Sequence, residues 1–270
     1  MRASRVVLRG PEVAVAEVHC DGDEVTWSAE ESVTNFGIVL VRRGLFRRRV
    51  DGVESLADAA SAYLQVSGST QQMAHPCGGD VCTFLALSRT LLGSLVDQAE
   101  RAPASTHLLF TTSATGLAHR LLLGRAAQGA DAFELTERAT ALGGELLHAV
   151  ASDDALDGRT PSPRTRAIVD RARQELSTDL HLGLGDLARR AGVSAFYLSR
   201  IFRRATGWTL SRYRAELRRR RALERLAAGE RNLANLAAEL GYSDQAHLTR
   251  SLRSAIGATP GALRSQLDGG

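Results

Sequence analysis

The feature that most constrains this chain is an internal repeat in its C-terminal part. The segments 187–214 and 236–264 align along their whole length once one residue is added before Leu248. The matched pairs are Leu187/Leu236, Ala188/Ala237, Gly192/Gly241, Ser194/Ser243, Leu198/Leu248, Arg200/Arg250, Arg203/Arg253, Ala205/Ala255, Gly207/Gly257, Thr209/Thr259 and Arg214/Arg264. Because apolar, glycine, hydroxyl and basic positions all stay in register, the two segments are predicted to be one structural unit that occurs twice.

Each copy has the pattern of a short helix, a tight turn and a second helix. Gly192 marks the first turn, where a positive φ suits glycine, and Ser194 is a natural N-cap for the helix that follows. The core positions of the second helices recur at spacings of three and four. They are Tyr197, Leu198, Ile201 and Phe202 in the first copy, and Leu248, Leu252 and Ala255 or Ile256 in the second. The pattern predicts helix-turn-helix motifs at 184–207 and 233–257, whose second helices can enter a DNA major groove.

The other positions of the second helices are left on an outer, solvent-facing side. They are Phe196, Ser199, Arg200 and Arg203 in the first copy, and Gln245, Ala246, Thr249, Arg250 and Arg253 in the second. Arginine can make two hydrogen bonds to guanine and glutamine two to adenine, so Arg200 and Gln245 are the leading candidates for base recognition. Arg203 and Arg253 are candidates for phosphate contacts, which carry no sequence preference.

Charge is divided unevenly along the chain. Residues 1–159 contain 14 Arg and 20 acidic residues, net −6, whereas residues 160–270 contain 20 Arg and 10 acidic residues, net +10. A compact basic segment beside an acidic one is typical of a protein that binds nucleic acid. The alternative is a small helical domain whose arginines form only a solvated face. Two tandem motifs in a segment of this charge favour DNA binding.

Residues from about 165 to 267 resemble the DNA-binding domain of the AraC-type (AraC/XylS) transcriptional regulators. The resemblance is carried by LARRAGVSAFYLSRIFRRATG, from residue 187, and LAAELGYSDQAHLTRSLRSAIGATP, from residue 236. It implies that the two motifs bind successive major-groove segments on one DNA face, with a long helix between them. By position it implies base contacts from Phe196, Ser199 and Arg200, and from Gln245, Ala246, Thr249 and Arg250. The chain departs from the family at Arg219, where an apolar residue is usual, and at Leu263, where an aromatic one is common.

An arginine-rich helix of about 18 residues is expected between the two motifs. In its sequence RAELRRRRALERL, a stripe along one side consists of Arg214, Arg218, Arg221 and Arg225, spaced four, three and four residues apart. The apolar side shifts along the helix, from Leu210, Tyr213 and Leu217 to Ala222, Leu223 and Leu226. This shift predicts packing into the first motif and then into the second. Either the stripe contacts phosphates, with Arg218 and Arg221 as candidates, or it is a solvated helix face.

The N-terminal half is predicted to be mainly β. Alternating segments (VAVAEVHC, NFGIVLVRRGLFRRRV, AYLQVS and DVCTFLALS) predict a small β-barrel, and ATGLAHRLLLGRAAQ and DAFELTERATALGGELLHAV predict two amphipathic helices. This half resembles the cupin-like sensory domain of many AraC-type proteins, which implies a barrel that receives an effector and helices that dimerise. The predicted class is therefore α+β. Its predicted parts are a cupin-like barrel (1–105), a helical dimerisation segment (106–152), a linker (153–163) and an all-α DNA-binding domain (164–270).

The segment HPCGGDVC, residues 75–82, is a candidate metal or redox site. His75, Cys77 and Cys82 provide one imidazole and two thiols, a donor set for zinc or another soft metal, or for thiol redox sensing. The alternative is a Gly-Gly turn between strands, with the cysteines as small buried apolar residues. His19 and Cys20 can add ligands only if the fold brings them near.

Three classes of function follow. The first is a sequence-specific transcriptional regulator, homodimeric on double-stranded operator or promoter DNA and controlled by a small-molecule effector, with RNA polymerase as a further candidate partner. The second is a redox- or soft-metal-responsive regulator that uses His75, Cys77 and Cys82. The third is a cupin enzyme fused to a DNA-binding domain, which is disfavoured because the His-x-His, Glu and later His of such enzymes are missing. We therefore predict no catalytic residues and no obligatory cofactor.

Hydropathy and cysteine content bear on the compartment. No apolar run reaches the roughly 18 residues of a spanning helix, and the first residues lack the apolar core of a signal peptide. Three cysteines in a chain of 270 residues do not resemble a disulfide framework. A cytoplasmic protein with no membrane partner is expected.

Overall fold

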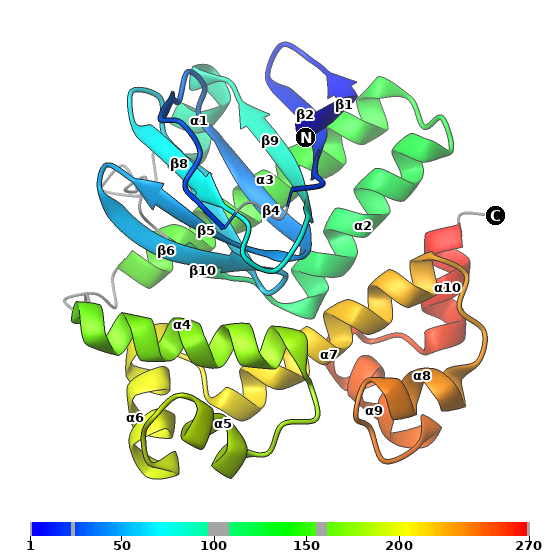
Figure 1. Cartoon of the computed structure of the whole chain (residues 1–270). Helices are drawn as coiled ribbons and strands as arrows, with labels where there is room; N and C mark the ends of the chain where they lie inside the picture. The colour runs from blue at the N-terminus through cyan, green and yellow to red at the C-terminus, as the bar shows by residue number, and fades with distance from the viewer. Residues whose placement is uncertain (1, 23–24, 97–107, 155–160, 269–270) are drawn as a thin grey trace. The chain divides into compact units, whose positions relative to one another are not determined.

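The computed structural model describes residues 2–22, 25–96, 108–154 and 161–268. Its contacts divide the chain into two units (Figure 1). The first comprises Met1–Thr111 and Arg125–Asp157, and the second comprises Thr112–Gly124 and Gly158–Gly270. The first is rich in strands and the second is helical, which confirms the predicted α+β class.

The larger sheet of the first unit has six antiparallel strands in the order β1-β2-β9-β4-β7-β10. Their bounds are β1 (Arg2–Arg9), β2 (Val13–Cys20), β9 (Asp80–Leu87), β4 (Gly37–Arg43), β7 (Ser61–Gln65) and β10 (Leu108–Phe110). The central strand β4 is a continuous run of buried residues over Gly37–Val41, as expected for a strand covered on both faces. The edge strand β1 is mostly exposed and carries a bulge between Val6 and Leu8, a feature that protects an edge from pairing with another chain.

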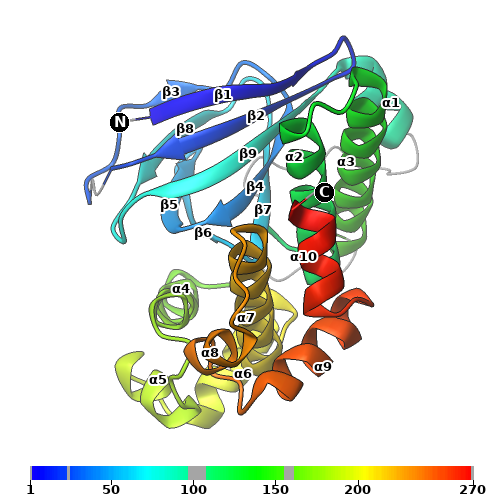
Figure 2. The same ribbon diagram turned by 90° about the vertical axis from the view of Figure 1, so that its right-hand side faces the viewer.

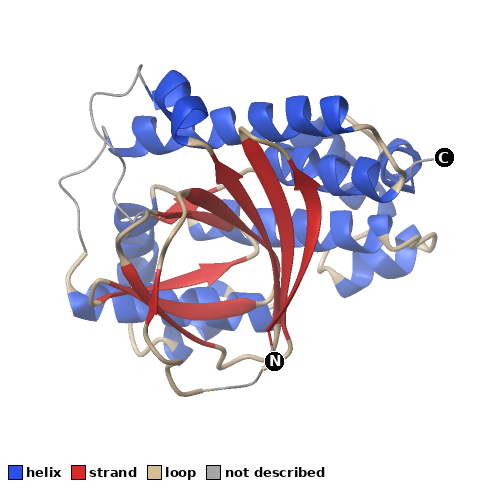
Figure 3. Cartoon of the chain, turned by 90° about the horizontal axis from the view of Figure 1, so that it is seen from above, coloured by secondary structure: helices blue, strands red, loops and turns tan. Residues whose placement is uncertain are grey.

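The smaller sheet has four strands in the order β3-β8-β5-β6. They are β3 (Glu31–Ser32), β8 (Thr70–Ala74), β5 (Leu45–Val50) and β6 (Val53–Asp58). Strands β5 and β6 form a hairpin through Asp51-Gly52, where both φ angles are positive (47° and 81°), as an Asp-Gly hairpin turn requires. The strands lie in two antiparallel sheets (Figure 3), so the predicted closure into a barrel is not confirmed, because no ladder joins the described strands of one sheet to those of the other.

Helices follow the sheets as the sequence predicts. In the first unit, α1 (Arg89–Val96) contacts α3 (Ala132–Asp154), and α3 packs on β1, β2, β9 and β10. The buried residues of α3 lie on one face, at Leu135, Ala139, Leu142 and Leu146. Helix α2 (Ser113–Ala127) belongs to the second unit up to Gly124. Both segments predicted to be helices are helical, but the predicted amphipathic character holds only for α3, because α2 buries polar residues such as His119 and Arg120 beside Leu122 and Leu123.

The second unit contains two helix-turn-helix motifs joined by one long helix (Figure 2). Its further helices are α4 (Pro163–Thr178), α5 (Leu184–Arg190), α6 (Ala195–Thr206), α7 (Leu210–Ala227), α8 (Leu233–Glu239), α9 (Gln245–Ile256) and α10 (Pro260–Asp268). The joining helix α7 has the expected 18 residues. All six apolar residues expected to shift sides along α7 are buried, which confirms that it contributes to the core along its whole length.

The predicted domain boundaries stay predictions. The boundary at 105/106 lies within residues 97–107, and most of the linker 153–163 lies within residues 155–160, both outside the described ranges.

Candidate nucleic-acid interface and ligand cavity

Both second helices of the motifs begin at a side-chain cap and end at a left-handed glycine. Ser194 accepts a hydrogen bond from the Tyr197 amide before α6, and Gly207 ends that helix with φ 71°. Before α9 the cap is Asp244, which accepts from the His247 amide, and Gly257 ends the helix with φ 80°. Ser194 and Asp244 hold the same capping position, so the residue added in the second copy lies in the turn between Gly241 and Asp244.

Electrostatics favour this second cap. The hydrogen bond from the His247 amide lowers the pKa of the Asp244 carboxyl below its usual range. The carboxylate thus stays ionised at the positive end of the α9 dipole, where a negative charge is stabilised.

The predicted base-contacting positions lie on the outer sides of α6 and α9. Phe196 is 79% exposed. Arg200 is exposed, with its guanidinium 5.5 Å from the centre of the Tyr197 ring. The remaining predicted contacts are exposed, at Arg203, Gln245, Ala246, Arg250 and Arg253, or half-buried, at Ser199 and Thr249. The residues that face inward from the same helices, Leu198, Ile201 and Phe202 in α6 and Leu248 and Leu252 in α9, are buried. The structure thus gives these positions the accessibility that DNA contact needs, and the contacts themselves stay a prediction.

Three of the four arginines in the α7 stripe contact the last turn of α4 or the residues that follow it, and the fourth, Arg225, pairs with Glu230 and Glu239. Arg214 and Arg218 donate to the carbonyl oxygens of Leu182 and Leu180 at 2.9 and 2.8 Å, and Arg221 donates to that of Ser177. Ser177 lies in the last turn of α4, where a cation satisfies an unpaired carbonyl and is stabilised by the helix dipole, whereas Leu180 and Leu182 follow the helix. Burial lowers the pKa of Arg218 from its ordinary value. Neither alternative from the sequence, phosphate contact or solvated face, included this use of the guanidinium groups.

The family departure at Arg219 has a structural reason. Its guanidinium donates to Glu216 at 2.7 Å and to the Ser113 hydroxyl at 2.9 Å, and Ser113 also donates to the buried Glu216 carboxylate. The neighbouring Arg220 is buried and donates to the Thr112 carbonyl at 2.6 Å. Within the second unit, α7 is therefore attached to the start of α2 by polar contacts where an apolar residue would give packing alone.

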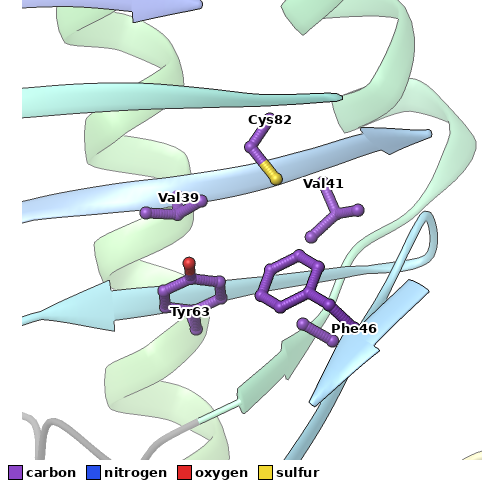
Figure 4. Packing of buried hydrophobic residues seen from close by; sticks show 6 residues of the cluster. Val39, Val41, Phe46, Tyr63 and Cys82 are labelled. Atoms are coloured by element: carbon purple, nitrogen blue, oxygen red, sulfur yellow. The ribbon is translucent and has the colours of Figure 1, made fainter. Parts of the chain in front are cut away.

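A cavity of about 510 Å³ lies in the first unit, lined by strands of both sheets. Val39, Phe46, Tyr63 and Cys82 form an apolar cluster at its wall (Figure 4), with the Phe46 and Tyr63 rings edge-on at 6.2 Å between centroids. Polar lining residues include Arg2, Gln65, Gln71, His75 and Asp80. A cavity of this size, lined by both apolar and polar side chains, is large enough for a small molecule.

His75 meets Cys20 and Asp80 at this cavity. One ligand atom of each lies within 4.8 Å of the others. His75 Nε2 is 2.8 Å from Asp80 Oδ1, and the hydrogen bonds to Asp80 and then to Cys20 raise the pKa of His75 to about 9. The imidazole is therefore protonated near neutral pH and paired with the buried carboxylate.

Of the three residues predicted as metal ligands, the structure places only His75 in this group. Cys77 is exposed, and Cys82 is buried, with its thiol donating to Asp80 Oδ2 at 3.0 Å. Burial raises the pKa of Cys82 well above its ordinary value. Cys82 thus matches the alternative of a small buried residue. Cys20, which the sequence offered as a ligand only if the fold brought it near, does lie beside His75. Sequence reasoning missed Asp80, although it lies inside the quoted segment.

Two capped helix-turn-helix motifs with exposed basic sides, joined by one helix, define a DNA-binding protein of the tandem helix-turn-helix class. A helix-turn-helix domain family model matches residues 187–266. Regulatory protein SoxS of Salmonella typhimurium is 34% identical over 89 residues, which are 33% of this chain and 83% of SoxS. The HTH-type transcriptional regulator GlxA of Rhizobium meliloti is 32% identical over 128 residues, 44% of this chain and 38% of GlxA.

The chain belongs to the AraC-type family of DNA-binding transcriptional regulators. Among solved structures, fatty-acid-bound ToxT from Vibrio cholerae aligns over 97% of this chain and 98% of ToxT, with a TM-score of 0.38 and 12% identity. In the part of the chain that the structure describes, no helix has the length and apolarity needed to cross a membrane.

Proposed function

We propose that this protein binds a specific operator or promoter sequence through α6 and α9, as a homodimer in the cytoplasm, and regulates transcription without catalysing a reaction. The observation that carries the proposal is the pair of capped helices, whose outer sides expose arginine and glutamine side chains and whose inner sides bury leucines. Arg200 and Gln245 select bases, and Phe196 meets a thymine methyl group, an apolar contact that the major groove offers. Ser199, Ala246, Thr249 and Arg250 complete the contacting sides.

Selection of binding sites from random double-stranded DNA tests this proposal. We expect the full chain to enrich one motif, and Arg200→Ala and Gln245→Ala each to lose preference at particular base pairs, by about 1–3 kcal/mol. Arg171→Ala is the matched control, since Arg171 is an exposed arginine of α4 outside both motifs. A uniform loss of affinity across all sequences would instead assign Arg200 or Gln245 to the phosphates.

We further propose that the cavity of the first unit receives a small organic effector. Its volume and its mixture of aromatic and polar walls support this role. Ala16 lines the cavity, so Ala16→Phe reduces its volume. We expect the variant to bind the operator normally and to lose the response to effector. A variant that responds like the native chain would place the effector elsewhere.

A further inference from the structure

Three chemically different metal-ligating side chains converge at one end of the cavity in the first unit. Cys20 supplies a sulfur, His75 a nitrogen and Asp80 an oxygen, all within 4.8 Å of one another. Within the described ranges, no other three His, Cys, Asp or Glu residues approach as closely. From this geometry we propose that Cys20, His75 and Asp80 bind one Zn²⁺ ion.

The donor set fits zinc in kind, charge and spacing. Zinc accepts thiolate, imidazole and carboxylate ligands at about 2.0–2.3 Å, which places tetrahedral ligand atoms roughly 3.5 Å apart. The observed group needs only a small contraction to reach that spacing. Binding of zinc releases the proton of the Cys20 thiol and the proton of the His75 imidazole, because both must be deprotonated to act as ligands. The thiolate and the carboxylate then neutralise the charge of the divalent ion, so the loaded site carries no net charge in a partly buried place. The sulfur ligand disfavours magnesium and calcium, which prefer oxygen.

Backbone structure holds two of the ligands, Cys20 and Asp80, in place before any ion arrives, and His75 directly follows β8. Cys20 ends β2 and is the direct cross-strand partner of Asp80, which begins β9. Gly79 packs so closely against the Cys20 carbonyl that no side chain fits there. This contact presses the loop that begins at His75 against the end of β2. Ligands carried by paired strands need little rearrangement to bind metal.

Surrounding contacts orient two of the ligands. The Cys82 thiol donates to Asp80 Oδ2 at 3.0 Å, which leaves Oδ1 directed at His75. The His75 ring packs against Phe46, with 5.6 Å between ring centroids. Such outer contacts fix the orientation of metal ligands and tune affinity.

Three protein ligands leave the fourth position of a tetrahedral ion open. Cys20, His75 and Asp80 all line the cavity, so that position is open to a donor atom of a bound molecule. This step deepens the effector site and rests on the proposed function. The ion would hold an effector that carries a thiol, carboxylate or imidazole group.

Zinc binding by the full chain, measured without DNA, tests the site directly. The protein is stripped with a chelator under a non-thiol reductant, titrated with zinc chloride or cobalt chloride, desalted and analysed for metal. We expect one ion per chain, and a thiolate-to-cobalt absorption band. Cys20→Ser and His75→Gln should weaken affinity by more than about 100-fold, beyond the usual effect of an outer contact. Cys77→Ser is the matched control, because it removes an exposed thiol from the same loop, and it should bind normally.

Several results would overturn the site. The site would be excluded if the native chain retained no ion, if the Cys20→Ser variant retained the ion, or if the Cys77→Ser variant lost it. Alkylation of the native chain makes the test independent of folding in the variants. Zinc should slow the labelling of Cys20 at least tenfold and leave that of Cys77 unchanged, whereas equal rates would contradict the proposal. Zinc binding without any effect on operator affinity would support the metal site and contradict its role in effector control.

Discussion

Phe196 and Glu17 are two exceptions to the usual burial of apolar side chains and exposure of charged ones. Phe196 is 79% exposed on α6, and contact with DNA is the role that we propose for it. Glu17 on β2 is buried instead, and its carboxylate accepts hydrogen bonds from Arg5 and, at 2.6 Å, from Arg42. Its partners explain why a charge is tolerated there.

Stability should depend on the ionisation of Glu17. Burial alone would raise the pKa of its carboxyl, but the hydrogen bond from Arg5 and the charge of Arg42 outweigh burial and lower it. A carboxyl with a lowered folded-state pKa contributes stability above its unfolded pKa and loses it as the pH falls through the folded value. We expect Glu17→Gln to cost about 1–3 kcal/mol at pH 7 and progressively less below about pH 4.5.

Urea unfolding of the native chain and of Glu17→Gln at pH 7 and pH 4 measures this effect. Glu12→Gln is a suitable control, since Glu12 is exposed. If the difference in free energy of unfolding between the native chain and Glu17→Gln stayed constant with pH, Glu17 would contribute through its shape and not through its charge.

At the scale of elements, the sequence predicts the helical part better than the sheets. Glycine turns, caps and the 3.6-residue period act locally, so both motifs and α7 follow from the sequence. The cap at Asp244 was missed because aligned repeats suggest the Ser243 position, and only geometry shows which side chain reaches the amide. Strands β1, β3, β6, β8 and β10 lack a clear apolar alternation, and sheet closure depends on pairing between distant segments.

The arginines of α7 give a prediction at this scale. Arg218 donates to the Leu180 carbonyl, and its guanidinium occupies the space that a Cβ at Gly241 would need, 2.5 Å away. We expect Arg218→Ala to lower the free energy of unfolding by about 1–3 kcal/mol, because a carbonyl loses a charged donor. The dependence of DNA affinity on salt should not change.

Chemical denaturation and salt titrations of operator binding separate the two roles of Arg218, with Arg171→Ala as the reference. If Arg218→Ala kept native stability and lowered the slope of log affinity against log salt by about one unit, Arg218 would be a phosphate contact, as the sequence suggested.

At the scale of the whole molecule, the sequence divides charge unevenly between an acidic first part and a basic second part. The second part of the chain carries net +10. Some of that charge is engaged internally, as in the contacts of Arg214, Arg218 and Arg221, so total charge overstates the number of phosphates that can be neutralised. The proposed metal ligands cannot be found from composition. Cys20 and Asp80 are 60 positions apart in sequence and meet through the pairing of β2 with β9.

Arg203 and Arg253 are exposed arginines at equivalent positions of the repeat. We expect the double variant Arg203→Ala and Arg253→Ala to reduce the slope of log affinity against log salt by about two units, with base preference unchanged. Fluorescence titrations with operator and unrelated DNA at several salt concentrations measure both quantities. A change in base preference, or an unchanged slope, would remove these residues from the phosphate contacts.

The unequal accessibility of the three cysteines has a practical consequence. Cys77 is exposed, Cys20 is half-buried and Cys82 is buried. A maleimide dye should therefore attach selectively at Cys77, two residues from His75, with no engineered mutation, and its emission should report occupancy of the cavity. The same exposure favours air oxidation to a disulfide-linked pair of chains. Sedimentation experiments on the self-association of this regulator therefore require a reductant.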